Sequence, residues 1–224
     1  MIWLLACTSS PLDSALDSQG VPRASLQLAF PLLERELFTE TAGVDHDPAV
    51  YEGIEQLICT AYDGRNFPAC YDEHKGSDYM LEGGFDTMDA GSASVLAAAD
   101  GVVLSVEDGH YDRCHGDAST FQNDCDGHEM TANHVVLEHE GGWTTRYWHL
   151  MTDSVAVEPG QQVACGEVLG KVGSSGNSSA PHLHFELQDA SGVDVDPYAG
   201  EHSQDQTFWV EQGEPEHLPG SACP

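Results

Sequence analysis

The stretch PHLHFEL at residues 181–187 decides the fold class, because polar and apolar side chains alternate along it. Successive side chains of a β-strand point to opposite faces. His182, His184 and Glu186 therefore share one face, while the apolar residues between them point into the core. Two adjacent imidazoles outside the core indicate a metal or catalytic site. Any half-buried strand alternates in the same way, so the stretch alone leaves both interpretations open.

Other short strands are expected before this one, with glycine turns between them. A turn signal at Asp100-Gly101 predicts a hairpin between residues 94–99 and 102–106. The regular spacing predicts an all-β, antiparallel fold with little helix, either a sandwich or a folded sheet. The remaining expected strands are residues 135–139, 143–148, 155–157, 168–172 and 182–187.

Composition divides the chain into four segments. Residues 1–24 resemble a lipoprotein signal and linker, and residues 25–73 are an extension expected to pack on the main domain, with a short helix near 49–58. The main domain is expected at residues 74–200 and a C-terminal tail at 201–224. A polar insertion at 109–132 interrupts the main domain. Its acidic residues do not match the spacing of an EF-hand loop, so a solvated acidic loop is expected there rather than a calcium site.

The charge is strongly negative: 38 acidic residues against 7 basic ones give −31. Such a surface repels nucleic acid phosphates and anionic lipid headgroups, so we expect neither as a partner. No stretch approaches the roughly 20 apolar residues that a membrane span requires. We interpret the charge as an adaptation to the environment and not as part of a mechanism.

Cys7 ends the sequence LLAC, which resembles the lipobox at which bacterial lipoproteins are cleaved and acylated. A lipid on Cys7 would be the one route to a membrane. The apolar stretch before it is short and lacks a basic residue, so a chance match at an ordinary N-terminus is the alternative.

The six other cysteines form an even set, which suggests disulfides in a protein exported to the periplasm, cell envelope or medium. Six cysteines allow about 15 pairings, and the sequence does not choose among them. The absence of a Cys-x-x-Cys spacing argues against a zinc–cysteine site. One of these pairings would close two short loops and pin the tail to the domain: Cys59–Cys70, Cys114–Cys125 and Cys165–Cys223.

Two further clusters contain histidine. His74 and Asp78 stand four residues apart, on one face of a strand or helix, and His149 follows two aromatic residues. Alone, the first would be a polar turn and the second a packed histidine. Together with the pair at 182 and 184, they supply two histidines and an aspartate for zinc with one position left for water, and two more histidines for proton transfer.

Four segments, between about Gly64 and Gly200, resemble the lysostaphin-type (LytM-like) zinc endopeptidases in the family's order. They are HKGSD at 74–78, residues 90–103, TRYWHL at 145–150, and the run from Gly160 to Glu186. The resemblance implies an antiparallel β-sheet groove of the duplicated hybrid motif type. It also implies one Zn²⁺ held by His74, Asp78 and His184, with His149 and His182 as the catalytic pair.

The resemblance further implies hydrolysis of stem or cross-bridge peptides of peptidoglycan by zinc-activated water. It does not say which histidine of the pair is the base. One alternative is a non-catalytic LytM-like module that binds cell wall or activates hydrolases, although all five site positions are kept here. Another is a secreted zinc peptidase that acts on proteins. The extra lengths at 79–89 and 109–132 put the choice of substrate in doubt, not the metal site.

Overall fold

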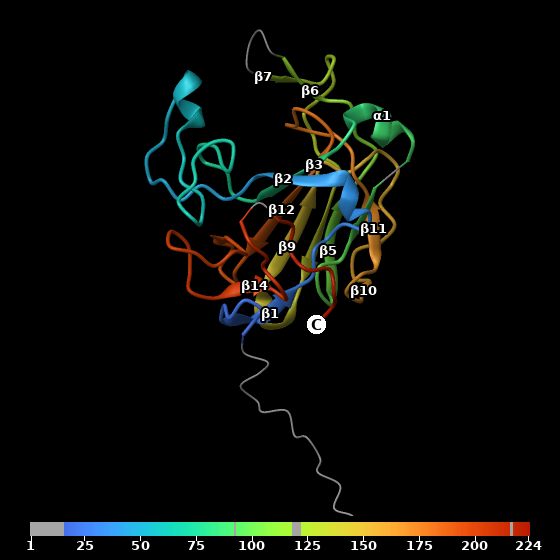
Figure 1. The fold of residues 1–224 in the computed structure, drawn as a ribbon. Helices are drawn as coiled ribbons and strands as arrows, with labels where there is room; N and C mark the ends of the chain where they lie inside the picture. The colour runs from blue at the N-terminus through green and yellow to red at the C-terminus, as the bar shows by residue number, and fades with distance from the viewer. Residues whose placement is uncertain (1–15, 92, 118–121, 216) are drawn as a thin grey trace, which may run out of the picture.

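A computed structural model describes residues 16–91, 93–117, 122–215 and 217–224 (Figure 1). Its centre is one antiparallel sheet of eight strands in the order β10-β5-β8-β9-β12-β3-β2, with β13 beside β12. The strands of this sheet are β2 (Phe38–Ala42), β3 (Ser77–Leu81), β5 (Gly101–Glu107), β8 (His134–Glu138), β9 (Thr144–Trp148), β10 (Gln162–Val163), β12 (His182–Gln188) and β13 (Asp194–Val195).

Within the described ranges, three pairs of strands lie outside this sheet, and the helices are short. The parallel pair is β1 (Arg23–Leu28) with β14 (Thr207–Trp209); the antiparallel pairs are β4 (Ser94–Leu96) with β11 (Val168–Lys171) and β6 (His115–Asp117) with β7 (Gln122–Asp124). The helices are α1 (Gly84–Asp89) and the 3-10 turns η1 (Arg35–Leu37), η2 (Gly53–Leu57) and η3 (Glu140–Gly142). No helix in the described ranges has the length and hydrophobicity of a membrane span.

The alternation along β12 produces the two faces of the central sheet. Leu183, Phe185 and Leu187 are completely buried in the main core, whereas His184 and Glu186 are only partly buried. Trp209 of β14 packs on the apolar face, with its ring centroid 5.6 Å from that of Phe185. The apolar side chains therefore fix which face of β12 carries the histidines. This outcome confirms the predicted β-rich antiparallel fold.

The predicted hairpin at Asp100-Gly101 is wrong. β4 pairs with β11, while β5 pairs with β8 and β10, so the chain crosses between two sheets at residues 97–100. A Cβ on Gly101 would lie 2.7 Å from the carbonyl oxygen of Glu138. The glycine therefore permits close contact with β8, and its φ lies outside the left-handed region that hairpin turns use.

Residues 155–157, predicted as a strand, form none. The N–H of Val155 donates to the carboxylate of Asp108 at 3.0 Å, and the N–H of Ala156 donates to the carbonyl oxygen of Leu169 at 2.9 Å, so the segment lies beside β11 without forming a ladder with it. The helix expected near 49–58 is the 3-10 turn η2, with bounds Gly53–Leu57. The other predicted strands, at 102–106, 135–139, 143–148, 168–172 and 182–187, are confirmed within one or two residues at their ends.

The segment before residue 74 belongs to the same structure as the main sheet. β2 pairs with β3 at the sheet edge, and the loop between them stands out to one side of the sheet in Figure 1. The insertion carries the hairpin β6–β7, which lies at the opposite end of the molecule from β1 and β14. Three disulfides are formed, Cys59–Cys70, Cys114–Cys125 and Cys165–Cys223, which is the pairing that the sequence suggested without choosing it. Cys7 lies outside the described residues.

Candidate active site

Three neighbouring strands bring the candidate site residues together. His184 on β12 stands directly opposite Asp78 on β3, and on its other side it stands opposite Trp148, the last residue of β9. Directly opposed residues of antiparallel strands have Cβ atoms about 5 Å apart. His149 follows Trp148, and His74 precedes β3. The sheet register thus gathers residues that are more than 100 positions apart in the sequence.

His74, Asp78 and His184 present three donor atoms to one point. Nδ1 of His184 lies 2.8 Å from Oδ1 of Asp78 and 3.1 Å from Nε2 of His74, and the last two atoms are 3.3 Å apart. Tetrahedral zinc with bonds of 2.0–2.2 Å would place neighbouring ligand atoms about 3.3 Å apart. The donor set and its spacing therefore fit a metal ion, and these side chains are well shielded from solvent.

Asp78 remains ionised in this setting. Burial raises the pKa of a carboxyl group, but the facing imidazoles of His74 and His182 hold the pKa of Asp78 well below its usual range. Burial likewise opposes charge on His184, yet hydrogen bonds to Asp78 and Glu186 raise the pKa of His184 to about 9. Because only a neutral imidazole ligates, a metal ion must displace the proton from Nδ1.

Each of the two candidate histidine ligands is oriented by a second hydrogen bond, made by the ring nitrogen that faces away from the site. The Nδ1–H of His74 donates to the carbonyl oxygen of Gly43 at 2.7 Å, which leaves Nε2 with its lone pair toward the site. The Nε2–H of His184 donates to Oε1 of Glu186 at 3.1 Å, which directs Nδ1 inward. Such outer partners fix the tautomer and the ring orientation of metal-binding histidines. Tautomers here follow from the hydrogen-bond partners.

His149 and His182 lie against this cluster, with ring centroids 4.6 Å apart. The Nδ1–H of each donates to a backbone carbonyl at 2.7 Å, that of Ser175 for His149 and that of Ala180 for His182. In both rings Nε2 is the remaining nitrogen, and in His182 it lies 3.5 Å from Asp78. Burial lowers the pKa of His149 well below normal, and the neighbouring histidines lower it further, so His149 is neutral.

The backbone of His149 is in an unusual conformation. Its φ of 65° lies in the left-handed region, which costs a non-glycine residue on the order of 1–3 kcal/mol. Gly173 is bonded to the backbone of His149 and to that of His182. The N–H of Gly173 donates to the carbonyl oxygen of His149 at 3.0 Å, and the carbonyl oxygen of Gly173 accepts the N–H of His182 at 3.1 Å. A Cβ on Gly173 would lie 2.6 Å from the backbone of Met151. The glycine loop therefore links the backbones of the two histidines.

Gly76 permits a similarly close approach near the metal donors. A Cβ at this position would lie 2.5 Å from the carbonyl oxygen of Phe185 and 2.9 Å from the ring of His184. Any side chain here would displace either β12 or the His184 imidazole. The glycine between His74 and Asp78 is thus required by space.

Tyr71 contacts two of the candidate ligands and was not among the predicted site residues. Its ring stacks on His74 with centroids 4.1 Å apart, and its hydroxyl donates to Oδ2 of Asp78 at 3.2 Å. Burial, followed by the charge of Asp78, raises the pKa of Tyr71. No motif marks this tyrosine. Glu186 was placed on the correct face by alternation, but its contact with His184 depends on side-chain geometry.

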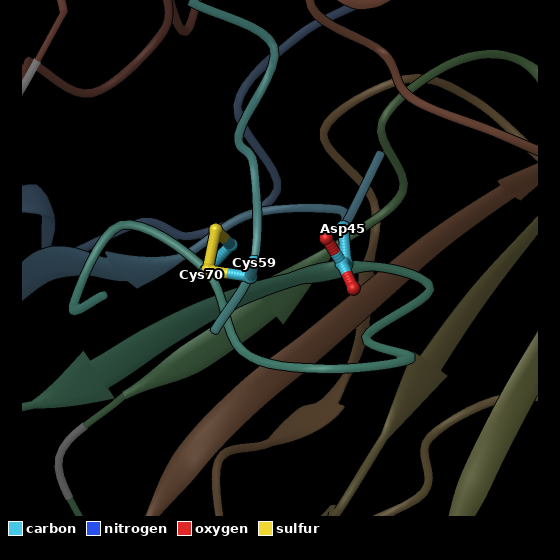
Figure 2. Close-up of side chains that lie close together, drawn as sticks. All are labelled: Asp45, Cys59 and Cys70. Atoms are coloured by element: carbon cyan, nitrogen blue, oxygen red, sulfur yellow. A yellow bond between two sulfur atoms is a disulfide. The ribbon is translucent and has the colours of Figure 1, made fainter. Parts of the chain in front are cut away.

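A second cluster, Asp45 with Cys59 and Cys70, also has donor atoms close together. Figure 2 shows that the two sulfur atoms are joined to each other, with the Asp45 carboxylate beside them. A disulfide has no thiolate to offer a metal. This cluster is therefore structural.

The family profile described as Peptidase family M23 matches residues 74–197, more than half of the chain. The chain belongs to this family. All five predicted site residues fall within the M23 match. The segment before His74 falls outside it, although it supplies Gly43 and Tyr71.

Curated relatives of this M23 domain include bacterial cell-wall enzymes. Peptidoglycan DD-endopeptidase ShyA of Vibrio cholerae is 40% identical over 60 residues, which are 27% of this chain and 14% of that protein. DD-carboxypeptidase/endopeptidase Mpg of Neisseria meningitidis is 30% identical over 162 residues, 72% of this chain and 30% of Mpg. The chain thus spans less than a third of either relative's length.

Among solved structures, the fold is similar to a chain described in the structure of the SpoIIQ–SpoIIIAH pore forming complex. The two are 24% identical with a TM-score of 0.50, and the match covers 82% of this chain and 94% of the other. At this identity the likeness supports the fold and nothing more.

Proposed function

We propose that this chain is a zinc-dependent endopeptidase that hydrolyses stem or cross-link peptides of bacterial peptidoglycan. The observation that carries the proposal is the convergence of His74, Asp78 and His184, whose donor atoms are 2.8–3.3 Å apart. Beside them lie His149 and His182, in which Nδ1 is bound to a backbone carbonyl and Nε2, among the described contacts, is not. Two nitrogens and one oxygen are the donors of many catalytic zinc sites with an open position.

In the proposed reaction, His74 would bind zinc through Nε2, His184 through Nδ1 and Asp78 through a carboxylate oxygen. Bound zinc supplies Lewis acidity, which polarises a peptide carbonyl and lowers the pKa of water to about 7. His149, neutral and held by Ser175, accepts a proton at Nε2 as water attacks. His149 then gives this proton from Nε2 to the leaving amine as the C–N bond breaks, and His182, whose Nδ1–H is bound to Ala180, assists the transfer through its Nε2 lone pair.

The substrate class is supported by the relatives: ShyA is named a peptidoglycan DD-endopeptidase, and Mpg a DD-carboxypeptidase/endopeptidase. Export is supported by the three disulfides, because such bonds persist in oxidising compartments. We propose that acylation of Cys7 holds the protein at the envelope, and that nucleic acid is not a partner because the net charge is −31.

The test is incubation of the purified chain with intact sacculi, with and without a chelator, followed by mass analysis of released fragments. We expect peptide fragments, their loss with chelator, and their return when zinc is added. A His149→Ala variant should keep zinc and lose most of its turnover, since proton transfer contributes about 10²–10⁴-fold. Release from protein substrates alone would favour a protein-directed peptidase. Wall binding without fragments would favour a non-catalytic module.

A further inference from the structure

The segment of residues 43–73, which precedes the M23 match, holds His74 at both its side chain and its backbone. Gly43 accepts the Nδ1–H of the ring through its carbonyl oxygen at 2.7 Å. The N–H of Asp45 donates to the carbonyl oxygen of His74 at 2.8 Å. Position and orientation of this imidazole are therefore set from outside the part of the chain that the family shares.

Asp45 is the central junction of this segment. Its Oδ1 accepts the backbone N–H groups of Asp47 at 2.9 Å and Thr60 at 3.0 Å, and its Oδ2 accepts the N–H of Glu73 at 3.1 Å. Hydrogen bonds to a charged acceptor are stronger than those between neutral groups. One carboxylate thus ties the start, the middle and the end of the segment together, and its last bond is made to the residue directly before His74.

Glu73 needs this support because its backbone is strained. Its φ of 58° lies in the left-handed region, which a residue with a Cβ seldom adopts unless its surroundings impose it. The bond from its N–H to Asp45 fixes that conformation. A relaxed Glu73 would rotate the peptide that leads into His74, and the imidazole would leave the point where Asp78 and His184 converge.

The disulfide Cys59–Cys70 cross-links two parts of the same segment. Both cysteines are completely buried, and the bond lies beside the Asp45 carboxylate (Figure 2). The N–H of Gly43 donates to the carbonyl oxygen of Ala69, the neighbour of Cys70, at 2.7 Å. The disulfide therefore fixes the position of Ala69, and Ala69 holds Gly43 through this hydrogen bond. The carbonyl oxygen of Gly43 in turn orients the ring of His74.

We propose that Asp45 and the Cys59–Cys70 disulfide form a positioning unit for His74. Metal affinity then depends on the segment before the M23 match and on whether this disulfide is oxidised or reduced. The inference rests on the proposed function in one respect, that His74 is a metal ligand. Asp45 acts through Glu73 and the backbone of His74, without contact with substrate or metal. Reduction of this one disulfide is expected to weaken zinc binding.

The chain offers matched controls for this unit. Asp47 lies in the same segment, is half-buried like Asp45, and accepts the N–H of Ala49 at 2.9 Å, but the described contacts of its carboxylate do not reach residues 73 or 74. The disulfide Cys165–Cys223 fixes the C-terminal tail near Asp100 and Ala98, away from the candidate ligands. Its removal tests the general loss of a disulfide.

The experiment measures the zinc affinity of the full chain by competition with a chromophoric chelator, together with the melting temperature of each metal-free variant. Asp45→Ala and the pair Cys59→Ala/Cys70→Ala should bind zinc about 10–100-fold more weakly, the range found for outer partners of metal ligands. The milder Asp45→Asn keeps Oδ1 but turns an amide toward the N–H of Glu73, and we expect an intermediate loss. Asp47→Ala and Cys165→Ala/Cys223→Ala should stay within about twofold of wild type, although the latter melts earlier.

Equal zinc affinity in wild type and the Asp45 and Cys59/Cys70 variants would overturn the inference and leave the proposed function standing. An equal loss in the Cys165/Cys223 variant would also overturn it, because affinity would then follow stability alone. A wild-type chain without zinc affinity would instead refute the proposed function, and the inference with it.

Discussion

Replacing Glu186 is expected to weaken metal binding without unfolding β12. Its Oε1 accepts the Nε2–H of His184 at 3.1 Å, and the side chains of the two residues are only 13% and 14% exposed. In Glu186→Ala this N–H has lost its acceptor in a place that water reaches poorly. An uncompensated buried donor is costly, and the ring loses the contact that directs Nδ1 toward Asp78.

The size of the effect follows from the same geometry. Outer-partner substitutions cost 10–100-fold in metal affinity, or about 1.4–2.7 kcal/mol. Low exposure limits solvent screening, so we expect Glu186→Ala near the upper end. Glu186→Gln retains an oxygen for the Nε2–H but loses the negative charge, and should fall near tenfold. Arg146, whose Nη1 is 3.8 Å from Oε2 of Glu186, cannot compensate, because a guanidinium has only donors and cannot accept the Nε2–H of His184.

The assay is chelator competition at fixed pH, combined with turnover at saturating zinc. Gln188→Ala is the control, because Gln188 lies two residues further along β12 and bonds Asp194 at 2.6 Å. The control should lose some stability and keep its zinc affinity. Wild-type affinity in Glu186→Ala would refute the role of this carboxylate, and an equal loss in Gln188→Ala would attribute the effect to the strand as a whole.

Three other expectations concern stability. Gly76→Ala forces a Cβ to within 2.5 Å of Phe185, so chemical denaturation should show a loss of about 1–3 kcal/mol, accompanied by weaker zinc binding as the His184 ring shifts. Burial lowers the pKa of His139 below its usual value, so the stability that neutral His139 confers is complete above about pH 6.5, the pKa in the unfolded chain. This stability is lost as the pH falls toward the lower pKa of the folded state. The difference in unfolding free energy between wild type and His139→Gln should therefore shrink on acidification, and a constant difference would contradict this. Removing Cys165–Cys223, which closes a separation of 58 residues, should cost about 4 kcal/mol by chain entropy, and an unchanged denaturation midpoint would contradict it.

The central strand and the shared face of its two histidines were predictable because they depend on local periodicity. Alternation along β12 places His182 and His184 on one face wherever the apolar face is buried, and the core buries Leu183 and Phe185 completely. The HKGSD motif required more than periodicity. Its contact with His184 comes from the pairing of β3 with β12, which the resemblance to a family supplied and local sequence did not.

The errors arose where one residue type serves two physical purposes. Glycine after aspartate usually marks a hairpin because it tolerates a positive φ, but Gly101 is required by the nearby carbonyl of Glu138. Similarly, the apolar pattern at residues 155–157 indicates a strand, yet Asp108 binds the N–H of Val155. In both places a tertiary contact, invisible to a local pattern, determined the backbone.

The part that the extension before residue 74 plays in the candidate site escaped prediction for a related reason. Its contacts with the site use a backbone carbonyl at Gly43 and carboxylate-to-backbone bonds at Asp45, and every residue carries such backbone groups. Sequence motifs record side chains, so a family match that starts at His74 begins at the first shared side chain and not at the first residue that shapes the site. Because β2 also completes the edge of the sheet beside β3, the segment is joined to the fold and to the candidate ligand at once. The unit that would perform the proposed chemistry is therefore longer than the unit that the family match delimits, and we expect changes in residues 43–73 to alter metal binding at the candidate site.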